Sequence, residues 1–157
     1  MKAASLKELR TELNTLLPLQ VLDLCMQLAK YKKENKELLT YLLFEAHNEK
    51  AFINEVKTEI DSLFLDVNRT NVYQAKKTIR KILRTTKKYI KYSGLKQTEV
   101  TLLIYFCKAL KTSRVPLTPN TALGNLYFAQ IQKIVKSLST LHEDLQHDYT
   151  EEMKDLI

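Results

Sequence analysis

Apolar residues recur at spacings of three and four along almost the whole chain, and strict alternation of apolar and polar residues is nowhere sustained. Two glycines and three prolines leave few of the turns that a sheet requires. The pattern therefore predicts an all-α protein. The expected helices cover residues 5–13, 18–33, 36–46, 48–67, 71–93 and 98–111, and a long C-terminal helix follows.

Local signals support several of these helix ends. Ser5 and Glu8 have the spacing of a capping box, in which each side chain satisfies a free amide of the other residue. Gly94 is suited to end the basic helix, because glycine readily adopts the left-handed conformation of a C-cap. Further helix starts are assigned to Pro18, Asn35, Asn48, and Thr70 or Asn71.

The segment 112–119, TSRVPLTP, is the one convincing internal linker in the pattern. Thr118 is expected to cap the long C-terminal helix, with Pro119 in its first turn. Gly124 lies inside this helix and costs about 1 kcal/mol relative to alanine unless a neighbour needs close approach. A kink or short break is therefore expected near Gly124.

Seven helices joined by short turns predict a single all-helical domain over residues 1–157, with antiparallel neighbours. Two architectures fit, a HEAT-like α-solenoid of stacked helical pairs and an irregular helical bundle. Similarity between VLDLCMQLAK and LLIYFCKALK favours stacking, since their cysteines are separated by about twice the period of HEAT-type repeats. Two short apolar helices can also match by accident, so both architectures stay open.

The helix expected at 71–93 is basic on one side only. On a helical wheel the apolar face consists of Val72, Ala75, Ile79, Ile82, Leu83, Thr86 and Ile90, and a neutral flank carries Tyr89 and Tyr92. The cations share one arc, which we call the cationic stripe: Lys76, Lys77, Arg80, Lys81, Arg84, Lys87, Lys88 and Lys91. Residues 67–98 contain no acid and carry +10, whereas the net charge of the chain is +7.

The cationic stripe contains five like-charge pairs four residues apart, which cost roughly 1–2.5 kcal/mol together at low salt. Salt screening, acids on other helices or an external polyanion could offset this repulsion. The candidate acids are Glu55, Glu59 and Asp66 in the fourth expected helix, and Glu143, Asp144, Asp148, Glu151 and Glu152 near the C-terminus.

The sequence therefore predicts a non-enzymatic helical binding module whose cationic stripe binds nucleic acid or another polyanion. Tyr73 lies among the cations and is added to this site, because an aromatic ring can stack on an unpaired base. The alternative is a protein–protein interaction scaffold, in which the stripe docks an acidic partner or the chain's own acidic C-terminal helix.

No catalytic, metal or cofactor motif is identified. HEDLQH differs from the zinc motif HExxH because its histidines are five residues apart, which turns the second imidazole away from the first. Cys25 and Cys107 lie among apolar residues and are expected to be buried and reduced. No segment has the length of an apolar membrane span, and the expected location is the cytoplasm. Nothing in the pattern specifies an oligomeric state.

Overall fold

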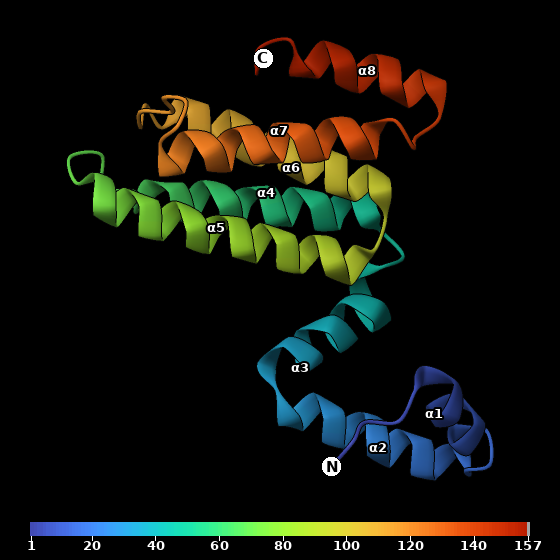
Figure 1. Ribbon diagram of the computed structural model, residues 1–157. Coiled ribbons are helices and arrows are strands. Elements are labelled where there is room, and N and C mark those ends of the chain that lie inside the picture. Colours follow the sequence, from blue (N-terminus) through green and yellow to red (C-terminus); the bar gives the residue numbers. More distant parts are fainter. Residues whose placement is uncertain (157) are drawn as a thin grey trace. The chain divides into compact units, whose positions relative to one another are not determined.

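The structure is a computed structural model that describes residues 1–156. Over these residues the chain forms eight α-helices, α1 to α8, and one five-residue π-helical segment, with no strand (Figure 1). The predicted all-α class is confirmed. The chain divides after Phe44 into two compact units, whereas the sequence predicts one domain.

The N-terminal unit contains α1 (Leu6–Leu13), α2 (Pro18–Tyr31) and α3 (Lys33–Thr40), and the π-helical segment η1 (Tyr41–Glu45) spans the division. The capping box at the start of α1 is confirmed, since Glu8 accepts hydrogen bonds from the backbone and hydroxyl of Ser5, each at 2.7 Å. Pro18 occupies the first turn of α2, as predicted.

The predicted cap of the third helix is wrong. The N-cap of α3 is Lys32 rather than Asn35, and Asn35 instead lies within the first turn of α3. Its side-chain amide donates a hydrogen bond of 2.8 Å to the Leu28 carbonyl near the end of α2. Asn35 therefore satisfies a carbonyl that the end of α2 leaves open, and no helix start is needed to explain it.

The apolar side chains of the N-terminal unit are far less buried than the pattern predicts. In α2, Val21 and Ala29 are half-buried, whereas Leu22, Cys25 and Leu28 are exposed. The predicted burial of Cys25 is therefore wrong. Three short helices enclose too little volume to form a core of their own, because buried surface falls steeply in small units.

The C-terminal unit contains α4 (Glu49–Leu65), α5 (Val72–Ser93), α6 (Lys96–Thr112), α7 (Ala122–Leu138) and α8 (Glu143–Met153). Asn48 and Asn71 cap α4 and α5 through their side chains, and Gly94 ends α5 in the left-handed conformation with φ of 69°. These three predicted helix ends are confirmed.

The core of this unit is built around α6, which packs against α4, α5, α7 and α8 (Figure 1). Its sequence is apolar on most faces, and such a helix is expected at the centre of a helical fold. The buried residues of α6 are Thr98, Val100, Leu102, Leu103, Ile104, Phe106, Cys107 and Leu110. The segments around Cys25 and Cys107 therefore occupy different environments, one exposed and one central.

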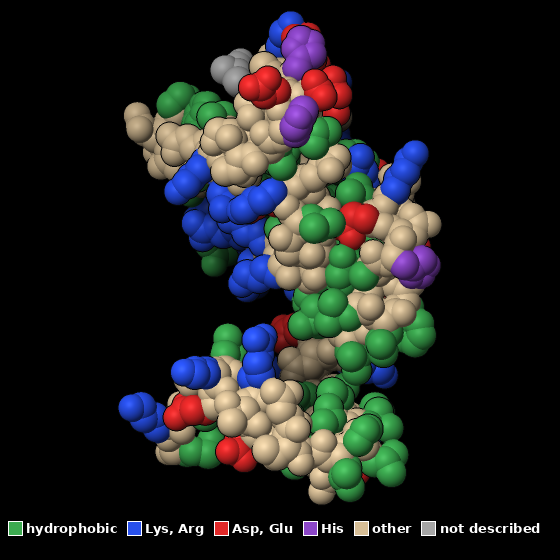
Figure 2. Space-filling model, turned by 90° about the vertical axis from the view of Figure 1, so that its right-hand side faces the viewer, with side chains coloured by type: hydrophobic (Ala, Val, Ile, Leu, Met, Phe, Trp, Pro, Cys, Tyr) green, Lys and Arg blue, Asp and Glu red, His purple; other side chains and the backbone are tan. Residues whose placement is uncertain are grey.

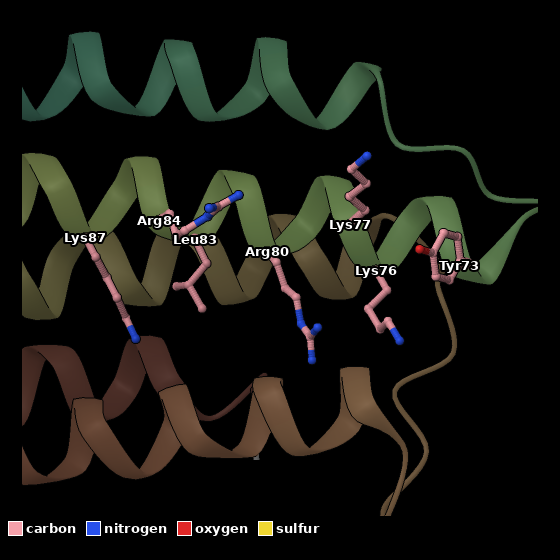
Figure 3. Close-up of a pocket in the computed structure, with 7 residues that line it drawn as sticks. All are labelled: Tyr73, Lys76, Lys77, Arg80, Leu83, Arg84 and Lys87. Carbon is pink, nitrogen blue, oxygen red and sulfur yellow. The ribbon is translucent and has the colours of Figure 1, made fainter. Parts of the chain in front are cut away.

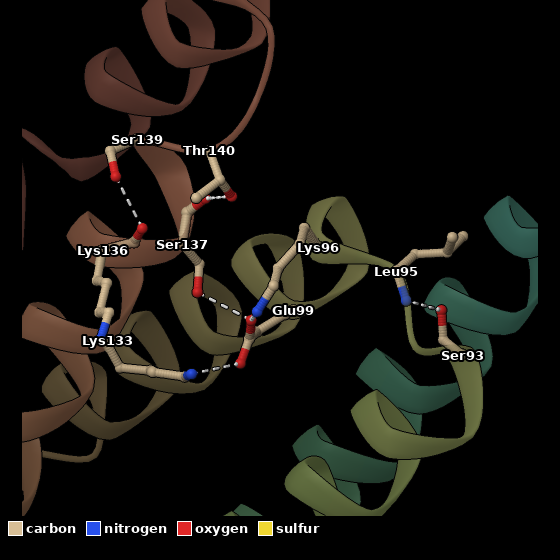
Figure 4. Close-up of polar contacts among 9 residues, drawn as sticks. All are labelled: Ser93, Leu95, Lys96, Glu99, Lys133, Lys136, Ser137, Ser139 and Thr140. Atoms are coloured by element: carbon tan, nitrogen blue, oxygen red, sulfur yellow. Dashed lines mark hydrogen bonds and ion pairs between the residues drawn. The ribbon is translucent and has the colours of Figure 1, made fainter.

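The C-terminal region forms two helices where the pattern predicts one. The chain leaves α7 after Leu138, and the hydroxyls of Ser139 and Thr140 donate hydrogen bonds to the carbonyls of Lys136 and Ser137, at 2.9 and 2.7 Å (Figure 4). Such side-chain bonds help to satisfy carbonyls of the last helical turn, and the Ser137 carbonyl also accepts the Thr140 amide at 3.2 Å. The break lets α8 fold back onto α6 and α7.

Gly124 lies in the first turn of α7, and the N-cap of α7 is Thr121 rather than the predicted Thr118. A Cβ atom on Gly124 would lie 2.0 Å from the backbone carbonyl oxygen of Thr118. The glycine thus permits the close approach of the loop before α7. The helix-free segment from Ser113 to Thr121 is partly buried, with Ser113 and Val115 inside the fold.

Candidate polyanion-binding surface on α5

The three faces predicted for α5 are present in the structure. Ala75, Ile79, Ile82, Leu83, Thr86 and Ile90 are buried against the unit's core. Val72, which the helical wheel places on the same face, is instead 59% exposed. It is the first residue of the helix, and it lines a hollow beside the start of α7 rather than the core.

The neutral flank of α5 engages the acids of α4. Tyr89 donates a hydrogen bond of 2.6 Å to Glu59, and its ring packs edge-on against Phe52 with ring centroids 6.0 Å apart. Near the end of α5, Ser93 and Thr98 both donate hydrogen bonds to Glu49, the latter at 2.6 Å. Two carboxylates of α4 therefore accept hydrogen bonds from hydroxyl groups, those of Tyr89 and Ser93 on α5 and that of Thr98 on α6.

Six cations of the stripe are exposed, and no ion pair within residues 1–156 involves any of them. They are Lys77, Arg80, Lys81, Arg84, Lys87 and Lys91. The remaining two are half-buried and lie near aromatic rings. The Lys76 ammonium is 5.7 Å from the Tyr73 ring centroid, and the Lys88 ammonium is 4.7 Å from that of Tyr89.

The acidic helix α8 lies on the side of the unit away from α5 (Figure 1). It packs against α6 and α7, where Glu152 forms an ion pair of 3.2 Å with Lys108. Glu151 pairs with Lys154 of its own segment at 2.6 Å. In Figure 2, lysine and arginine side chains gather in one patch, and a group of acids lies at the top of the view.

A hollow of about 660 Å³ follows the stripe along α5 (Figure 3). Its lining residues all belong to α5: Tyr73, Lys76, Lys77, Arg80, Leu83, Arg84 and Lys87. We call this the cationic hollow. The structure thus brings together six of the nine residues predicted for the site, whereas Lys81, Lys88 and Lys91 are not part of its lining. Lys76, Arg80 and Lys87 extend from α5 toward α7.

A second hollow of about 290 Å³ lies between the start of α5 and the start of α7. Tyr73 and Lys76 line both hollows, so the two meet at these side chains. The other lining residues of the second, which we call the apolar hollow, are Val72, Pro116, Thr121, Ala122 and Leu123. The sequence pattern of α5 alone gives no sign of the residues from 116–123, because only the fold brings them beside Tyr73.

The sulfur and imidazole groups form no comparable site. Cys107 is fully buried, and burial raises the pKa of its thiol to about 12, which keeps it protonated and unreactive. Cys25 is exposed, and neither cysteine is in a disulfide. His142 caps α8, where its Nδ1 accepts a hydrogen bond of 3.4 Å from the Asp144 amide. No three His, Cys, Asp or Glu side chains of the described residues gather as metal ligands.

Comparison of the chain with protein-family models, with curated proteins and with solved structures finds no match. In the part of the chain that the structure describes, no helix combines the length and the apolar character needed to cross a bilayer.

Proposed function

We propose that the chain is a non-enzymatic binding module that binds nucleic acid along α5. The observation that carries the proposal is the set of six exposed stripe cations that lack an ion pair within residues 1–156. Four of these six line the cationic hollow, together with the half-buried Lys76. A surface lined by several cations along one helix is an arrangement that attracts a chain of phosphates.

The charge pattern of α5 favours an external polyanion, rather than acids of the same chain, as the partner of the cationic stripe. Glu152 of α8 pairs with Lys108 of α6, Glu151 pairs with Lys154, and Glu59 of α4 accepts a hydrogen bond from the Tyr89 hydroxyl. The repulsion within the pairs Lys77/Lys81, Arg80/Arg84 and Lys87/Lys91 is therefore not offset by an ion pair within residues 1–156. Phosphates along the stripe would relieve it and would release condensed counterions.

The length of the stripe suits a polymer better than a single small anion. Lys76 and Lys91 are fifteen residues apart on one helix, which corresponds to about 22 Å at the rise of an α-helix. Several backbone phosphates of a nucleic acid fit within that length. Contacts of lysine and arginine with phosphates carry no base information, so this part of the binding is expected to be independent of sequence.

The test is fluorescence anisotropy with labelled oligonucleotides at about 50 and 200 mM salt. About five contacts in the cationic hollow predict that log Kd rises with log salt with a slope near 4. Arg80→Glu/Arg84→Glu should weaken binding at least roughly tenfold at low salt and should lower the slope by about 2. The matched control is Lys7→Glu/Lys50→Glu, which makes the same change in net charge at exposed positions outside the hollow.

Absence of binding at low salt contradicts the proposal, as does an equal loss of affinity in both double variants. Polyglutamate serves as the comparison polyanion. If it binds through Arg80 and Arg84 and oligonucleotides do not, the stripe belongs to a scaffold that docks an acidic protein, which is the rival expectation from the sequence.

A further inference from the structure

From the junction of the two hollows we infer that the nucleic acid is single-stranded and that one of its bases stacks on Tyr73 within the apolar hollow. This inference rests on the proposed function and narrows it to one class of nucleic acid. Tyr73 and Lys76 line both hollows, so a phosphate on the cations and a base in the apolar hollow can belong to one strand.

The position of Tyr73 is unusual for an aromatic residue of this unit. Its side chain is 72% exposed, whereas Tyr127 and Tyr149 are buried and donate or share hydrogen bonds with Leu156 and Thr101. Tyr89, on the same helix, packs against Phe52 and Tyr92. An exposed ring next to cations offers a face on which a base can stack.

The apolar hollow provides the second surface that a base needs. Val72, Ala122 and Leu123 supply aliphatic walls, and the volume of about 290 Å³ lies at the lower end of small-molecule sites. A flat aromatic ring system fits such a space better than a bulky group does. Gly124 allows the loop before α7 to lie close to the first turn of α7, because a Cβ at this position would clash with the Thr118 carbonyl.

We infer a single strand because Tyr73 must reach the face of a base. In a duplex the base faces are stacked inside the helix and only the edges reach the grooves, so Tyr73 would meet no exposed face. A single strand turns its bases outward while its phosphates remain on the cations. The cationic hollow supplies Arg80, Arg84 and Lys87 for those phosphates, and Lys76 lies at the junction.

The test compares three labelled probes by anisotropy on the full chain: a single-stranded oligonucleotide of about 20 nucleotides, the matching duplex, and an abasic strand with the same number of phosphates. The ordinary strand should bind roughly 5- to 150-fold more tightly than the abasic strand, the range expected for stacking of one base. Tyr73→Ala should remove most of this difference without changing the salt slope, and Tyr73→Phe should keep it.

Tyr31 supplies a matched control. It is 76% exposed and has the Lys32 ammonium 5.9 Å from its ring centroid, but it lines neither hollow. Tyr31→Ala should bind all three probes as the unaltered chain does. Circular dichroism of each variant should show unchanged helix content, since both tyrosines are exposed.

The outcomes separate the two proposals. Equal affinity for the ordinary and abasic strands, or an unchanged preference in Tyr73→Ala, overturns the stacking inference. In that case a loss of binding in Arg80→Glu/Arg84→Glu would still support nucleic-acid binding along α5. Duplex binding as tight as single-strand binding also overturns the inference. Failure of every probe to bind at low salt overturns both.

Discussion

Glu99 of α6 makes three polar contacts, two of which reach α7 (Figure 4). Its carboxylate lies 2.9 Å from Lys96, accepts a hydrogen bond of 2.8 Å from Ser137, and pairs with Lys133 at 3.2 Å. Partial burial acts to raise the pKa of Glu99, but the hydrogen bonds from Lys96, Ser137 and Lys133 outweigh it and hold the pKa below its ordinary value of 4.5. The carboxylate is therefore a stabilising contact only while it is ionised.

Glu99→Gln should lower the free energy of unfolding by about 1–2 kcal/mol at neutral pH, because it removes the charge from these contacts. Since the folded-state pKa is depressed, the stabilisation is present above about pH 4.5 and is lost as pH falls through the folded pKa. The difference between the unaltered chain and the variant should therefore shrink below pH 4.5. Urea denaturation at several pH values measures it.

Glu151→Gln is the control at the same scale. Glu151 also contacts a lysine, Lys154 at 2.6 Å, but both side chains are more than half exposed. Such a pair contributes between zero and about 1 kcal/mol. An effect of Glu151→Gln as large as that of Glu99→Gln would show that burial at the α6–α7 contact does not strengthen the interaction.

At the scale of elements, α5 shows which features of a helix its local sequence can predict. Its cap at Asn71, its end at Gly94 and its buried face except Val72 were all predictable, because a 22-residue helix repeats its pattern over six turns. The sequence did not predict which cations of the stripe line the cationic hollow and which do not. The lining of a hollow depends on the directions of the side chains and on the neighbouring helices. A helical wheel gives only the angle of each residue around the helix axis, so it contains neither kind of information.

Other elements show where local pattern fails. The break between α7 and α8 leaves the apolar spacing almost undisturbed, and the hydroxyls of Ser139 and Thr140 bond carbonyls at the end of α7. Asn35 has the residue type of an N-cap, yet it bonds back to Leu28. In both cases the residue type is compatible with more than one local hydrogen-bonding pattern, so the sequence alone does not specify the helix end.

Arg84→Glu tests whether repulsion among the cations of α5 lowers the free energy of unfolding. The substitution replaces repulsion with Arg80 and Lys88, four residues away on either side, by attraction. At 0.2–0.5 kcal/mol for each pair lost or gained, the free energy of unfolding should rise by about 1–2 kcal/mol at low salt. Thermal denaturation at low and high salt measures this, and the gain should shrink with salt.

Arg84→Gln provides the matched variant, since it removes the repulsion without adding attraction and should give about half the gain. Binding of oligonucleotides should weaken in both variants. A lower free energy of unfolding in Arg84→Glu would contradict the argument, because it would mean that the arginine makes a stabilising contact within the chain.

At the scale of the whole molecule, charge and core are unevenly distributed. Residues 67–98 carry +10 and the rest of the chain sums to −3. Among residues 1–156, all buried hydrophobic side chains except that of Tyr41 belong to the unit after Phe44. The composition predicts a chain that can bury a sizeable core, but it does not show that this core lies within one part of the length.

A fragment of residues 45–157 should therefore fold on its own and should retain nucleic-acid binding. It contains α4 to α8 and the cationic stripe, with the central helix α6 packed by four neighbours. Its thermal unfolding should be cooperative, with a midpoint close to that of the main transition of the full chain, because the N-terminal unit adds little buried apolar surface.

The salt slope of binding to the single-stranded oligonucleotide should also be unchanged in this fragment, since the lining of the cationic hollow is supplied by α5 alone. A fragment of residues 1–44 should show lower helix content per residue and a broad, non-cooperative transition, because short helices without a shared core are marginal in water. Loss of cooperative unfolding on removal of residues 1–44 would contradict the prediction that residues 45–157 fold on their own.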